Sequence, residues 1–370
     1  MWIYFFNLAL WVGFHCFIHY CRNRCEYRDS KPRCGGLSIL ICARDESDTI
    51  ADCLHSIASQ KWLPEPIEVI VIDDHSSDNT VQITEEFAKE HPQLGIRVER
   101  LDATRAGKRM ALLEAVGMAS HDMLFLTDAD CILSDECLKQ HFDACSAENA
   151  SSIGPVFYES TASKSLLTRM MEHEMVVNAA ITEAYVCLGR PIMSNGANTM
   201  VSQIGRETLL HSLDHQTTAS GDDVFFMHEL DRQKKSVAFV REAVVETRPL
   251  MDFKELFHQR LRWAAKSKRY KSPAAVATGG FVFTVQTIFV IMLLHGMFTA
   301  ELLSSVLVIL MSKLAIEYGF HRSWAMSFGR KVFFVPSVFN SIAYPFYVVT
   351  VGAAALMGIG YKWKDRNYKH

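Results

Sequence analysis

The chain has 370 residues, of which 49% are hydrophobic, and its formal net charge at pH 7 is -3. A chain of this length holds one large domain or two, with ample core. The balanced charge lacks the basic excess that marks nucleic-acid-binding proteins, so nucleic acid is not an expected partner.

The N-terminal stretch from Trp2 to Tyr20 is almost free of charged residues. About nineteen such residues are enough to cross a bilayer. No basic residue precedes the stretch, and five follow it: Arg22, Arg24, Arg28, Lys31 and Arg33. This order is the reverse of a secretory signal. We therefore expect residues 1–20 to form an uncleaved anchor and the basic linker 21–36 to hold the next domain on the cytoplasmic side of the inner membrane.

Residues 37–250 show the alternation of short apolar runs and amphipathic stretches that is typical of an α/β domain with a mostly parallel sheet. The expected strands are Leu37 to Cys42, Ile67 to Asp73, Ile96 to Leu101 and Leu124 to Thr127. The expected helices are Ser47 to Ser59, one that ends at Lys89, and Gly107 to Met118.

Two acids, Asp128 and Asp130, end the strand that begins at Leu124. In open α/β sheets this edge is where ligands bind. One alternative is that the loop only caps a helix starting at Asp135, through Ser134. Against this, the polar segments "ICARDES", "DDHSSDNT", "AGKRM" and "TDAD" all fall on loops along the same edge, which caps alone do not require.

The residue types at this edge indicate a nucleoside diphosphate held with a metal ion. Oxygen ligands from Asp128 and Asp130 suit Mg²⁺ or Mn²⁺. Lys108 and Arg109, at a helix start, add positive charge and backbone N–H groups for a diphosphate. Glu46 and Asp74 are then available to accept hydrogen bonds from a base or ribose.

Between Leu37 and Trp263 the chain resembles family 2 glycosyltransferases of the GT-A fold. "ICARDES" resembles the family's P-A-x-N-E segment, with Cys42 in place of the usual proline. "VIDDHSSDNT" is similar to its V-D-D-x-S-x-D-x-T signature, "TDAD" to its D-x-D and "SGDDVFF" to its G-D-D. "QRLRW" fits the Q-x-x-R-W motif of membrane-bound hyaluronan, chitin and cellulose synthases. "SNGANTMVS" keeps Gly196 and Asn198 of the G-x-N segment but lacks the arginines that often follow.

This resemblance implies a role for each matching residue. The nucleotide sugar would contact Ala43, Arg44, Glu46, Asp74, Lys108 and Asp128. The metal would bind Asp128 and Asp130, and Asp223 would be the catalytic base. The acceptor and diphosphate would lie near Asp222, Gln259, Arg262 and Trp263. A simpler interpretation of Asp222 and Asp223 is a favourable acid pair in the first turn of a helix from Val224 to Asp231, capped by Ser220.

The segment 251–274 is expected to form an amphipathic interface helix. Gln259, Arg262 and Trp263 fall at i, i+3 and i+4 and therefore share a face. A basic surface just ahead of the next apolar segment is expected to rest on anionic headgroups. Its members are Arg260, Lys266, Lys268, Arg269 and Lys271. In the simpler alternative, Trp263 is only an interfacial anchor and the basic residues are only topology signals.

Residues 275–360 are expected to form a C-terminal membrane region, followed by a basic tail at 361–370. The candidate spans are Gly279 to Phe298, Leu302 to Ile316, which contains Lys313, and Val332 to Ile359, which contains Pro336 and Pro345. Three full spans would put the tail outside, against the charge rule, so one segment is expected to be re-entrant or interfacial. A buried core helix suits Leu302 to Ile316 best.

The ten cysteines show no paired CxxC spacing, and they are expected to be reduced core residues. Together with these features, the resemblance implies a membrane-bound, metal-dependent, inverting glycosyltransferase with a nucleotide-diphosphate sugar as donor and a saccharide or lipid-linked acceptor. The alternatives are a haloacid-dehalogenase-like phosphotransferase, which also uses D-x-D, and a non-catalytic membrane receptor for nucleotide or saccharide. The sequence favours no particular sugar or oligomeric state.

Overall fold

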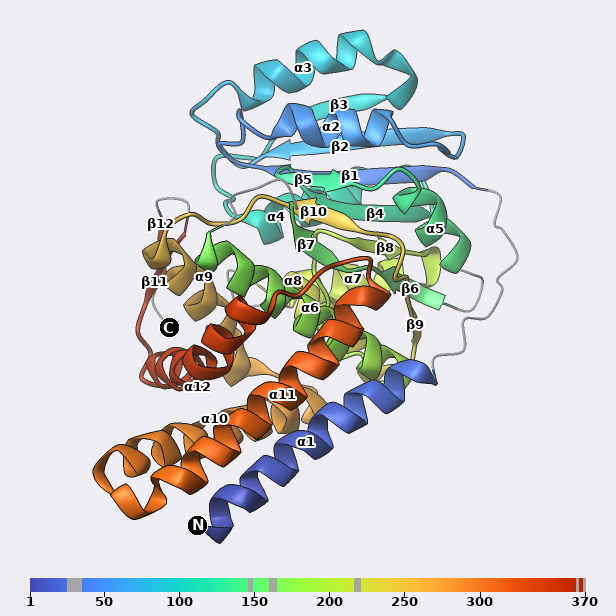
Figure 1. Ribbon diagram of the computed structural model, residues 1–370. Coiled ribbons are helices and arrows are strands. Elements are labelled where there is room, and N and C mark those ends of the chain that lie inside the picture. The colour runs from blue at the N-terminus through green and yellow to red at the C-terminus, as the bar shows by residue number, and fades with distance from the viewer. Residues whose placement is uncertain (25–34, 146–148, 160–164, 216–220, 364–365, 369–370) are drawn as a thin grey trace. The chain divides into compact units, whose positions relative to one another are not determined.

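A computed structural model describes residues 1–24, 35–145, 149–159, 165–215, 221–363 and 366–368 (Figure 1). Its internal contacts divide the chain into two compact units. The helical unit comprises Met1–Cys25, Thr161–Ala184 and Pro249–His370. The sheet unit comprises Glu26–Ser160 and Tyr185–Arg248. Each unit is described by itself.

The sheet unit is built on a seven-stranded sheet of order β3-β2-β1-β4-β8-β6-β9. Its strands are β1 Leu37–Ala43, β2 Ile67–Asp73, β3 Ile96–Arg100, β4 Met123–Asp128, β6 Asn149–Ile153, β8 Thr199–Val201 and β9 Ser236–Phe239. The first four strands of that order are parallel, β8 runs antiparallel to β4 and β6, and β9 is parallel to β6. The sheet is therefore mixed and mostly parallel, as the sequence predicts.

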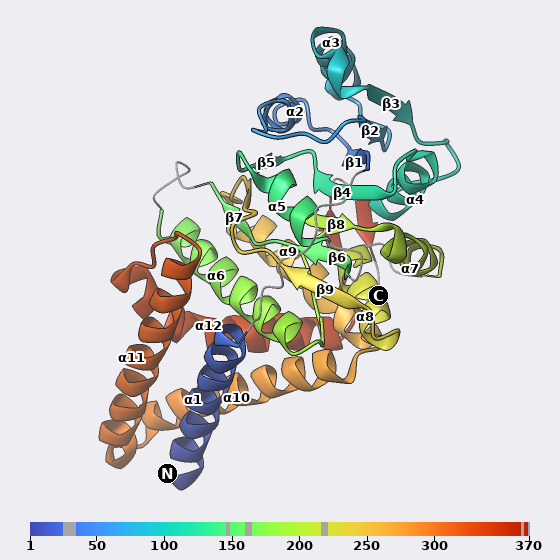
Figure 2. The ribbon, with the colours of Figure 1, turned by 90° about the vertical axis from the view of Figure 1, so that its right-hand side faces the viewer.

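Helices cover both faces of this sheet, and a small second sheet lies beside it. The helices are α2 Ile50–Ala58, α3 Thr80–Glu90, α4 Lys108–Met118, α5 Cys137–Ala144, α7 Gln203–Asp214 and α8 Asp222–Arg232, with a 3-10 turn at Pro92–Leu94. The small sheet has the order β5-β10-β7, made of Cys131–Leu133, Val245–Thr247 and Val156–Tyr158. Figure 2 views the large sheet on edge, with α2 and α5 on one face and α4 and α7 on the other.

The central strands form where the sequence is apolar without alternation, because both faces of a covered parallel strand are buried. In β1, Leu37, Ile39 and Ile41 are fully buried, and so is the intervening Leu40. The predicted strands of this unit are confirmed to within about a residue at each end, a common margin between assignments. The first helix begins at Ile50 and not at Ser47, because Glu46 and Ser47 donate their N–H groups to Thr80 and Asp78.

The structure bears on the two caps that were considered as simpler alternatives. The helix after the acidic turn, α5, begins at Cys137 with Glu136 as its N-cap residue, and no side chain caps it. The hydroxyl of Ser134 makes no hydrogen bond. Ser134 is therefore not the cap of a helix from Asp135, because the helix begins at Cys137 with Glu136 at its N-cap position. Ser220 lies outside the described residues, and the N-cap position of α8 is Gly221.

The helical unit contains six long helices in the described part of the chain. They are α1 Trp2–Asn23, α6 Leu166–Cys187, α9 Phe253–Ala265, α10 Pro273–Phe298, α11 Leu303–Ser327 and α12 Phe334–Leu356. Two 3-10 turns, Lys266–Arg269 and Ala300–Leu302, precede α10 and α11, and a hairpin of Tyr361–Trp363 and Arg366–Tyr368 follows α12. Within the described residues, α1, α10 and α12 are long and apolar enough to cross a membrane. The helix expected at Leu302 to Ile316 extends to Ser327.

A buried ionic network lies on one face of α11. Lys313 and Glu317 are 1% and 5% exposed and pair at 2.6 Å. Glu317 also accepts hydrogen bonds from Trp11 Nε1 at 2.8 Å and from Ser341 Oγ at 2.5 Å. Because α1, α11 and α12 all contribute, the carboxylate of Glu317 joins three helices.

A chain of three imidazoles continues from this network. His321 Nε2 lies 3.1 Å from His15 Nε2, and His321 Nδ1 contacts His173 Nε2. His15 Nδ1 lies 3.0 Å from the carbonyl oxygen of Trp11 and can only donate to it. One direction of donation therefore links the three rings while all of them stay neutral, from His173 through His321 to His15.

Replacing Glu317 by Ala is expected to destabilise the helical unit strongly. The change leaves the Lys313 ammonium buried without its counter-charge, which typically costs about 3–5 kcal/mol. The double variant Lys313→Met with Glu317→Leu should recover much of this loss, because it removes both charges. Thermal unfolding in one detergent provides the comparison. A single variant that melts with the wild-type protein would show that the pair contributes nothing.

Candidate functional site in the sheet unit

The two acids of "DDHSSDNT" have different surroundings at the carboxyl end of β2. Asp73 is buried, accepts from Ser76 N at 3.1 Å and pairs with Arg100 at 3.0 Å, so it holds the loop. Asp74 accepts from Gly107 N at 3.0 Å. Its own N–H donates to the carbonyl of Ala43 at 2.8 Å. Asp74 therefore joins the loops after β1, β2 and β3.

The loop after β1 is fixed by a second set of polar contacts. Arg44 Nη1 donates to the carbonyl oxygen of Asp74 at 3.0 Å. Glu46 accepts from the hydroxyl of Thr49 at 2.9 Å through Oε2. Burial raises the pKa of Asp78, but hydrogen bonds from Thr80 and Ser47 lower it to about 2. The loops that carry the predicted nucleotide-binding residues are therefore tied to one another before any ligand binds.

Asp128, at the end of β4, forms an ion pair with Lys108 at the start of α4. The side chains are 32% and 25% exposed, so both remain accessible to a ligand. Burial lowers the pKa of Lys108, but Asp128 and Asp222 together raise it above its usual value. Lys108 is therefore charged at neutral pH.

Asp130 follows on the turn between β4 and β5. Its Oδ2 accepts from the hydroxyl of Thr247 at 3.2 Å, and its Oδ1 lies 3.5 Å from Cys131 Sγ. Thr247 belongs to β10, so the small sheet supports the acidic turn from behind. Among the described residues no group of three or more His, Cys, Asp or Glu side chains is placed to hold a metal ion.

The acids at the start of α8 lie close to this ion pair. A Cβ atom built on Gly196 would be 3.4 Å from Asp222 Oδ2, 3.4 Å from Asp223 Cβ and 3.7 Å from Lys108 Nζ. Gly196 therefore leaves the space in which the three side chains approach one another. Asp222 is buried, and Asp223 is half-buried with Oδ1 accepting from Val224 N at 2.8 Å.

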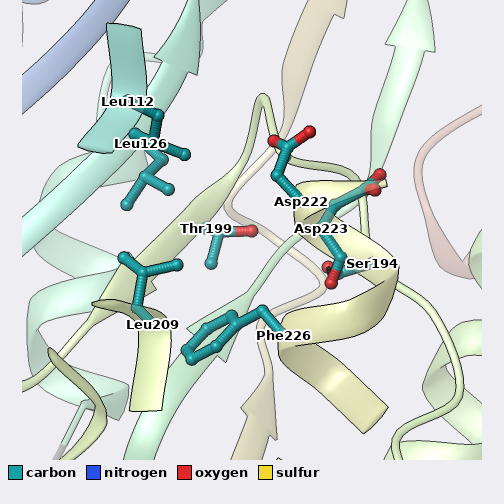
Figure 3. Close-up of a pocket in the computed structure, with 9 residues that line it drawn as sticks. Leu112, Leu126, Ser194, Thr199, Leu209, Asp222, Asp223 and Phe226 are labelled. Carbon is teal, nitrogen blue, oxygen red and sulfur yellow. Dashed lines mark hydrogen bonds between the residues drawn. The ribbon is translucent and has the colours of Figure 1, made fainter. Parts of the chain in front are cut away.

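A small pocket opens next to these acids (Figure 3). The residues that line it are Leu112, Leu126, Ser194, Gly196, Thr199, Leu209, Asp222, Asp223 and Phe226. Figure 3 shows the carboxylates of Asp222 and Asp223 leaving the same helix end in different directions, with the apolar side chains on the other side of the pocket. The acids therefore mark the boundary between a polar edge and an apolar interior.

Two supporting residues were not identified as a unit from the sequence. Asn198 Nδ2 donates to the carbonyls of Pro155 and Ala243 at 2.9 and 2.7 Å, so its Oδ1 must accept. His141 Nε2 lies 2.8 Å from that oxygen and carries the proton. Asn198 is fully buried and holds the loop after Gly196 in place. No pattern in the sequence links these two residues, because they are 57 positions apart.

Acidification is expected to destabilise the sheet unit through His141. Burial lowers the pKa of His141 and the hydrogen bond with Asn198 raises it. Burial has the larger effect, so the pKa is about 4. The unfolded chain, with a histidine pKa of about 6.5, binds the extra proton first, so stability is lost as pH falls from about 6.5 to about 4. The full effect is about 3 kcal/mol.

The matched control for this prediction is His141→Gln, which cannot titrate. The free energy of unfolding of both proteins is measured with denaturant in detergent at several pH values. The wild-type value minus the His141→Gln value should be smaller at pH 4 than at pH 7. Parallel curves for the two proteins would contradict the assignment of this pH dependence to His141.

The residues of the "QRLRW" segment lie on α9 in the helical unit. Gln259, Arg262 and Trp263 are half-buried. Arg260, which the sequence placed on the basic surface, is 1% exposed: it pairs with Glu174 at 2.8 Å and lies 4.2 Å above the ring of Trp263. It also donates to Gln259 Oε1. Arg260 thus positions two residues of the motif.

The basic surface is smaller than predicted. Lys266, like Arg260, is buried, at 7% exposure, so neither belongs to it. Lys268, Arg269 and Lys271 are exposed just before α10. The correction follows from helix geometry, because Arg260 lies on the face of α9 that turns inward while the later residues leave the helix.

The cysteines are mostly as expected, with one exception. Seven described cysteines are free, and five of these are buried. Cys187 is disulfide-bonded, so the prediction of reduced cysteines is wrong there. Cys187 is the last residue of α6 and is half-buried.

Comparison with known families and proteins gives consistent matches. The profile of Glycosyl transferase family 2 matches residues 38–202, and that of Glycosyl transferase family group 2 matches residues 123–320. The chain is 38% identical over 101 residues to a poly-beta-1,6-N-acetyl-D-glucosamine synthase of Staphylococcus epidermidis, covering 27% of this chain and 23% of that protein. It is 24% identical over 268 residues to a beta-monoglucosyldiacylglycerol synthase of Trichormus variabilis, covering 71% and 55%.

The fold is similar to that of a solved glycosyltransferase. The mannosyltransferase PcManGT from Pyrobaculum calidifontis, in complex with GDP-Man and Mn²⁺, matches with a TM-score of 0.58 and 15% identity over 92% of this chain and 96% of that one. The chain spans 23% and 55% of the length of the two curated relatives named above. The second family profile covers more than half of the chain, so the protein belongs to the family 2 glycosyltransferases and has their GT-A fold.

Proposed function

We propose that the protein is a membrane-bound, metal-dependent, inverting glycosyltransferase. It moves a sugar from a nucleotide-diphosphate donor to a lipid-linked or growing saccharide acceptor. The observation that carries this proposal is the arrangement around Gly196, where Lys108, Asp222 and Asp223 approach one another beside Asp128. A positive charge for a diphosphate and an acid for the acceptor therefore share one edge of the sheet.

The donor is held by the loops after β1, β2 and β3 and by the end of β4. Asp74 and Glu46 accept hydrogen bonds from the nucleoside, while Ala43 and Arg44 form the wall beside them. Lys108 leaves Asp128 to contact the diphosphate. This exchange is reasonable because both side chains are accessible and the ion pair is not sealed from solvent.

The residues at the acidic turn fit Mg²⁺ or Mn²⁺. Mg²⁺ is usually bound through one or two carboxylates together with substrate phosphates, not by an all-protein cage. Asp128 and Asp130 supply two carboxylates from one turn. When bound, such an ion offsets the charge that develops on the departing diphosphate. PcManGT, of the same fold, has been solved with GDP-Man and Mn²⁺.

Asp223 is the proposed base. The acceptor hydroxyl must lose a proton as it attacks the anomeric carbon, and one carboxylate on the acceptor side can take it. Asp223 is more exposed than Asp222, and Val224 N fixes one of its oxygens at 2.8 Å. Attack opposite the diphosphate inverts the anomeric centre.

The acceptor is proposed to be membrane-proximal. The curated relatives named above are a polysaccharide synthase and a glycolipid synthase, and three described helices have the length and hydropathy of membrane spans. In this proposal Gln259 and Arg262 contact the diphosphate and Trp263 contacts the acceptor. Family membership removes the phosphotransferase alternative, whereas a non-catalytic receptor predicts that Asp223 is dispensable.

The test is a panel of nucleotide sugars offered with Mn²⁺ to the full chain in detergent. Release of nucleoside diphosphate from one donor, stimulated by lipid or saccharide acceptors and abolished by excess chelator, is the expected result. Release of inorganic phosphate without sugar transfer, or binding without turnover, would contradict the proposal.

A further inference from the structure

Helices α1 and α11 run side by side in the same direction along their whole length. Four of the contacts between them are spread from end to end: Met1 with Ser305, Trp11 with Glu317, His15 with His321 and Arg22 with Ser327. The partners are separated by 304, 306, 306 and 305 positions, so the register is constant. From Met1 to Arg22 the paired length is about 32 Å, close to the hydrocarbon thickness of a bilayer.

Helix α10 connects to this pair in the opposite direction. It is followed by the short turn Ala300–Leu302 and then by α11, and a Cβ atom on Gly296 would lie 2.8 Å from Val306. Tyr4, near the start of α1, bonds to His295, near the end of α10, at 2.9 Å. The end of α10 and the starts of α1 and α11 therefore lie together.

The basic residues lie at the opposite ends of these three helices, which are the end of α1, the start of α10 and the end of α11. Arg22 and Arg24 lie at the end of α1, Lys268 and Lys271 before α10, and Arg330 and Lys331 after α11. The turn between α10 and α11 carries no lysine or arginine, and its one charged residue is Glu301. Basic residues mark the cytoplasmic side of membrane helices.

Helix α12 does not follow this pattern. Phe334, at the start of α12, packs against Tyr318, and Ser341 bonds to Glu317. The two residues of α12 are seven positions apart, whereas their partners on α11 are adjacent. Helix α12 therefore crosses α11 and does not run along it. Its last turns contact α9, where Ala354 and Ala355 pack with Leu261. Figure 2 shows α12 running across the direction of α1 and α11. The helix thus begins next to Lys331 and ends on α9, which precedes α10 on the basic side.

We propose that α1, α10 and α11 cross the bilayer, whereas α12 lies in the cytoplasmic side of the membrane with both of its ends facing the cytoplasm. Hydropathy alone selects α12 and passes over α11. The register argument reverses this choice, because a helix paired along its full length with a spanning helix must span as well. The topology rests on the membrane attachment proposed above and on no property of the transfer reaction.

The surface of α12 suits this position. Val335, Phe339, Ile342 and Phe346 are exposed and fall at i, i+4, i+7 and i+11, so they form one apolar stripe. The opposite face packs on the helical unit through Ser337, Ser341 and Ala355, which are buried. A helix that packs on the bundle with one face and is apolar on the other fits the acyl chains of one leaflet. Lys313 and Glu317 are tolerated in the hydrocarbon because they pair within the bundle, and Arg322, the exposed charge of α11, lies near its basic end.

The same arrangement satisfies the charge rule for the C-terminal tail. With α12 re-entrant, the exposed Lys362 returns to the side of Arg22, Lys271 and Lys331. With α12 spanning, the tail and the residues before α12 would lie on opposite sides. The partner that covers the stripe of α12 is therefore the cytoplasmic leaflet.

Single cysteines added to the full chain test the topology. Glu301→Cys, Lys331→Cys and Met357→Cys replace exposed side chains, and Met357 follows α12 directly. A membrane-impermeant maleimide is applied to intact spheroplasts and then to permeabilised ones, with the parent chain as the control for its own cysteines, including the exposed Cys16. The topology predicts that position 301 is labelled in intact spheroplasts and that 331 and 357 are labelled only after permeabilisation.

Each other pattern overturns the proposal in a defined way. Labelling of 357 but not 331 in intact spheroplasts means that α12 crosses. Equal access of 301 and 331 means that α11 does not. Recovery of the chain in the soluble fraction removes the membrane topology altogether. Since labelling needs no turnover, an inactive chain with the expected pattern would contradict the proposed transfer reaction and leave the topology standing.

Discussion

Replacing Asp223 by Asn is expected to lower the turnover of sugar transfer by about 10²–10⁴, the usual contribution of a general base. Asparagine keeps the size of the side chain, and its Oδ1 can still accept the 2.8 Å hydrogen bond from Val224 N, so the start of α8 should survive. The amide cannot accept a proton at neutral pH. The measurement is transfer at saturating donor, combined with nucleotide affinity in the presence of Mn²⁺, which should barely change.

Asp222→Asn is the matched control, because it makes the same change one residue earlier. Asp222 helps to keep Lys108 charged, so its loss is expected to reduce donor affinity modestly and turnover less than Asp223→Asn does. If Asp223→Asn retains near-normal transfer, Asp222 becomes the better base. If Asp223→Asn loses donor binding as severely as a change at Asp128, the acid belongs to the nucleotide site.

Replacing Asp128 or Asp130 by Ala is expected to abolish metal-dependent donor binding, and activity with it. Each change removes a carboxylate proposed to hold the cation on the diphosphate. Asp128→Ala also removes the partner of Lys108, whereas Asp130→Ala leaves that pair intact. Calorimetry with the nucleotide sugar, with Mn²⁺ and with excess chelator, gives the affinities directly.

The two variants together separate the metal from the lysine. If the cation matters, both should lose the Mn²⁺-dependent part of the donor affinity while retaining the far-ultraviolet circular dichroism of the wild-type protein. An unchanged affinity of the wild-type protein in excess chelator would contradict a metal role at this turn.

The sequence predicts the first half of the sheet unit well, because its signals are local. An apolar run such as Leu37 to Cys42 forms a strand wherever both faces can be covered, and the polar residues after it must then meet at one edge. For that reason the convergence of Asp74, Lys108 and Asp128 follows from strand order alone.

The parts that the sequence did not predict depend on contacts between distant residues. The support of Gly196 comes from Asn198 and His141, which no spacing connects. In the sequence Arg260 cannot be told from the other basic residues around it. Its burial depends on an ion pair with Glu174, which lies 86 positions earlier. Lys313, Glu317 and His321 have helical spacing, but their partners Trp11 and His15 lie on another helix, so only the tertiary structure shows that the charges are compensated.

The most direct test of the central claim is the fate of the donor sugar. Membranes containing the full chain are incubated with a radiolabelled nucleotide sugar and Mn²⁺, and the label is followed into lipid-extractable and polymeric products, beside Asp223→Asn membranes. The account predicts that labelled sugar enters one of these products only with the wild-type chain and only when the cation is present. Label that is recovered solely as unreacted donor, free sugar or sugar phosphate would contradict it.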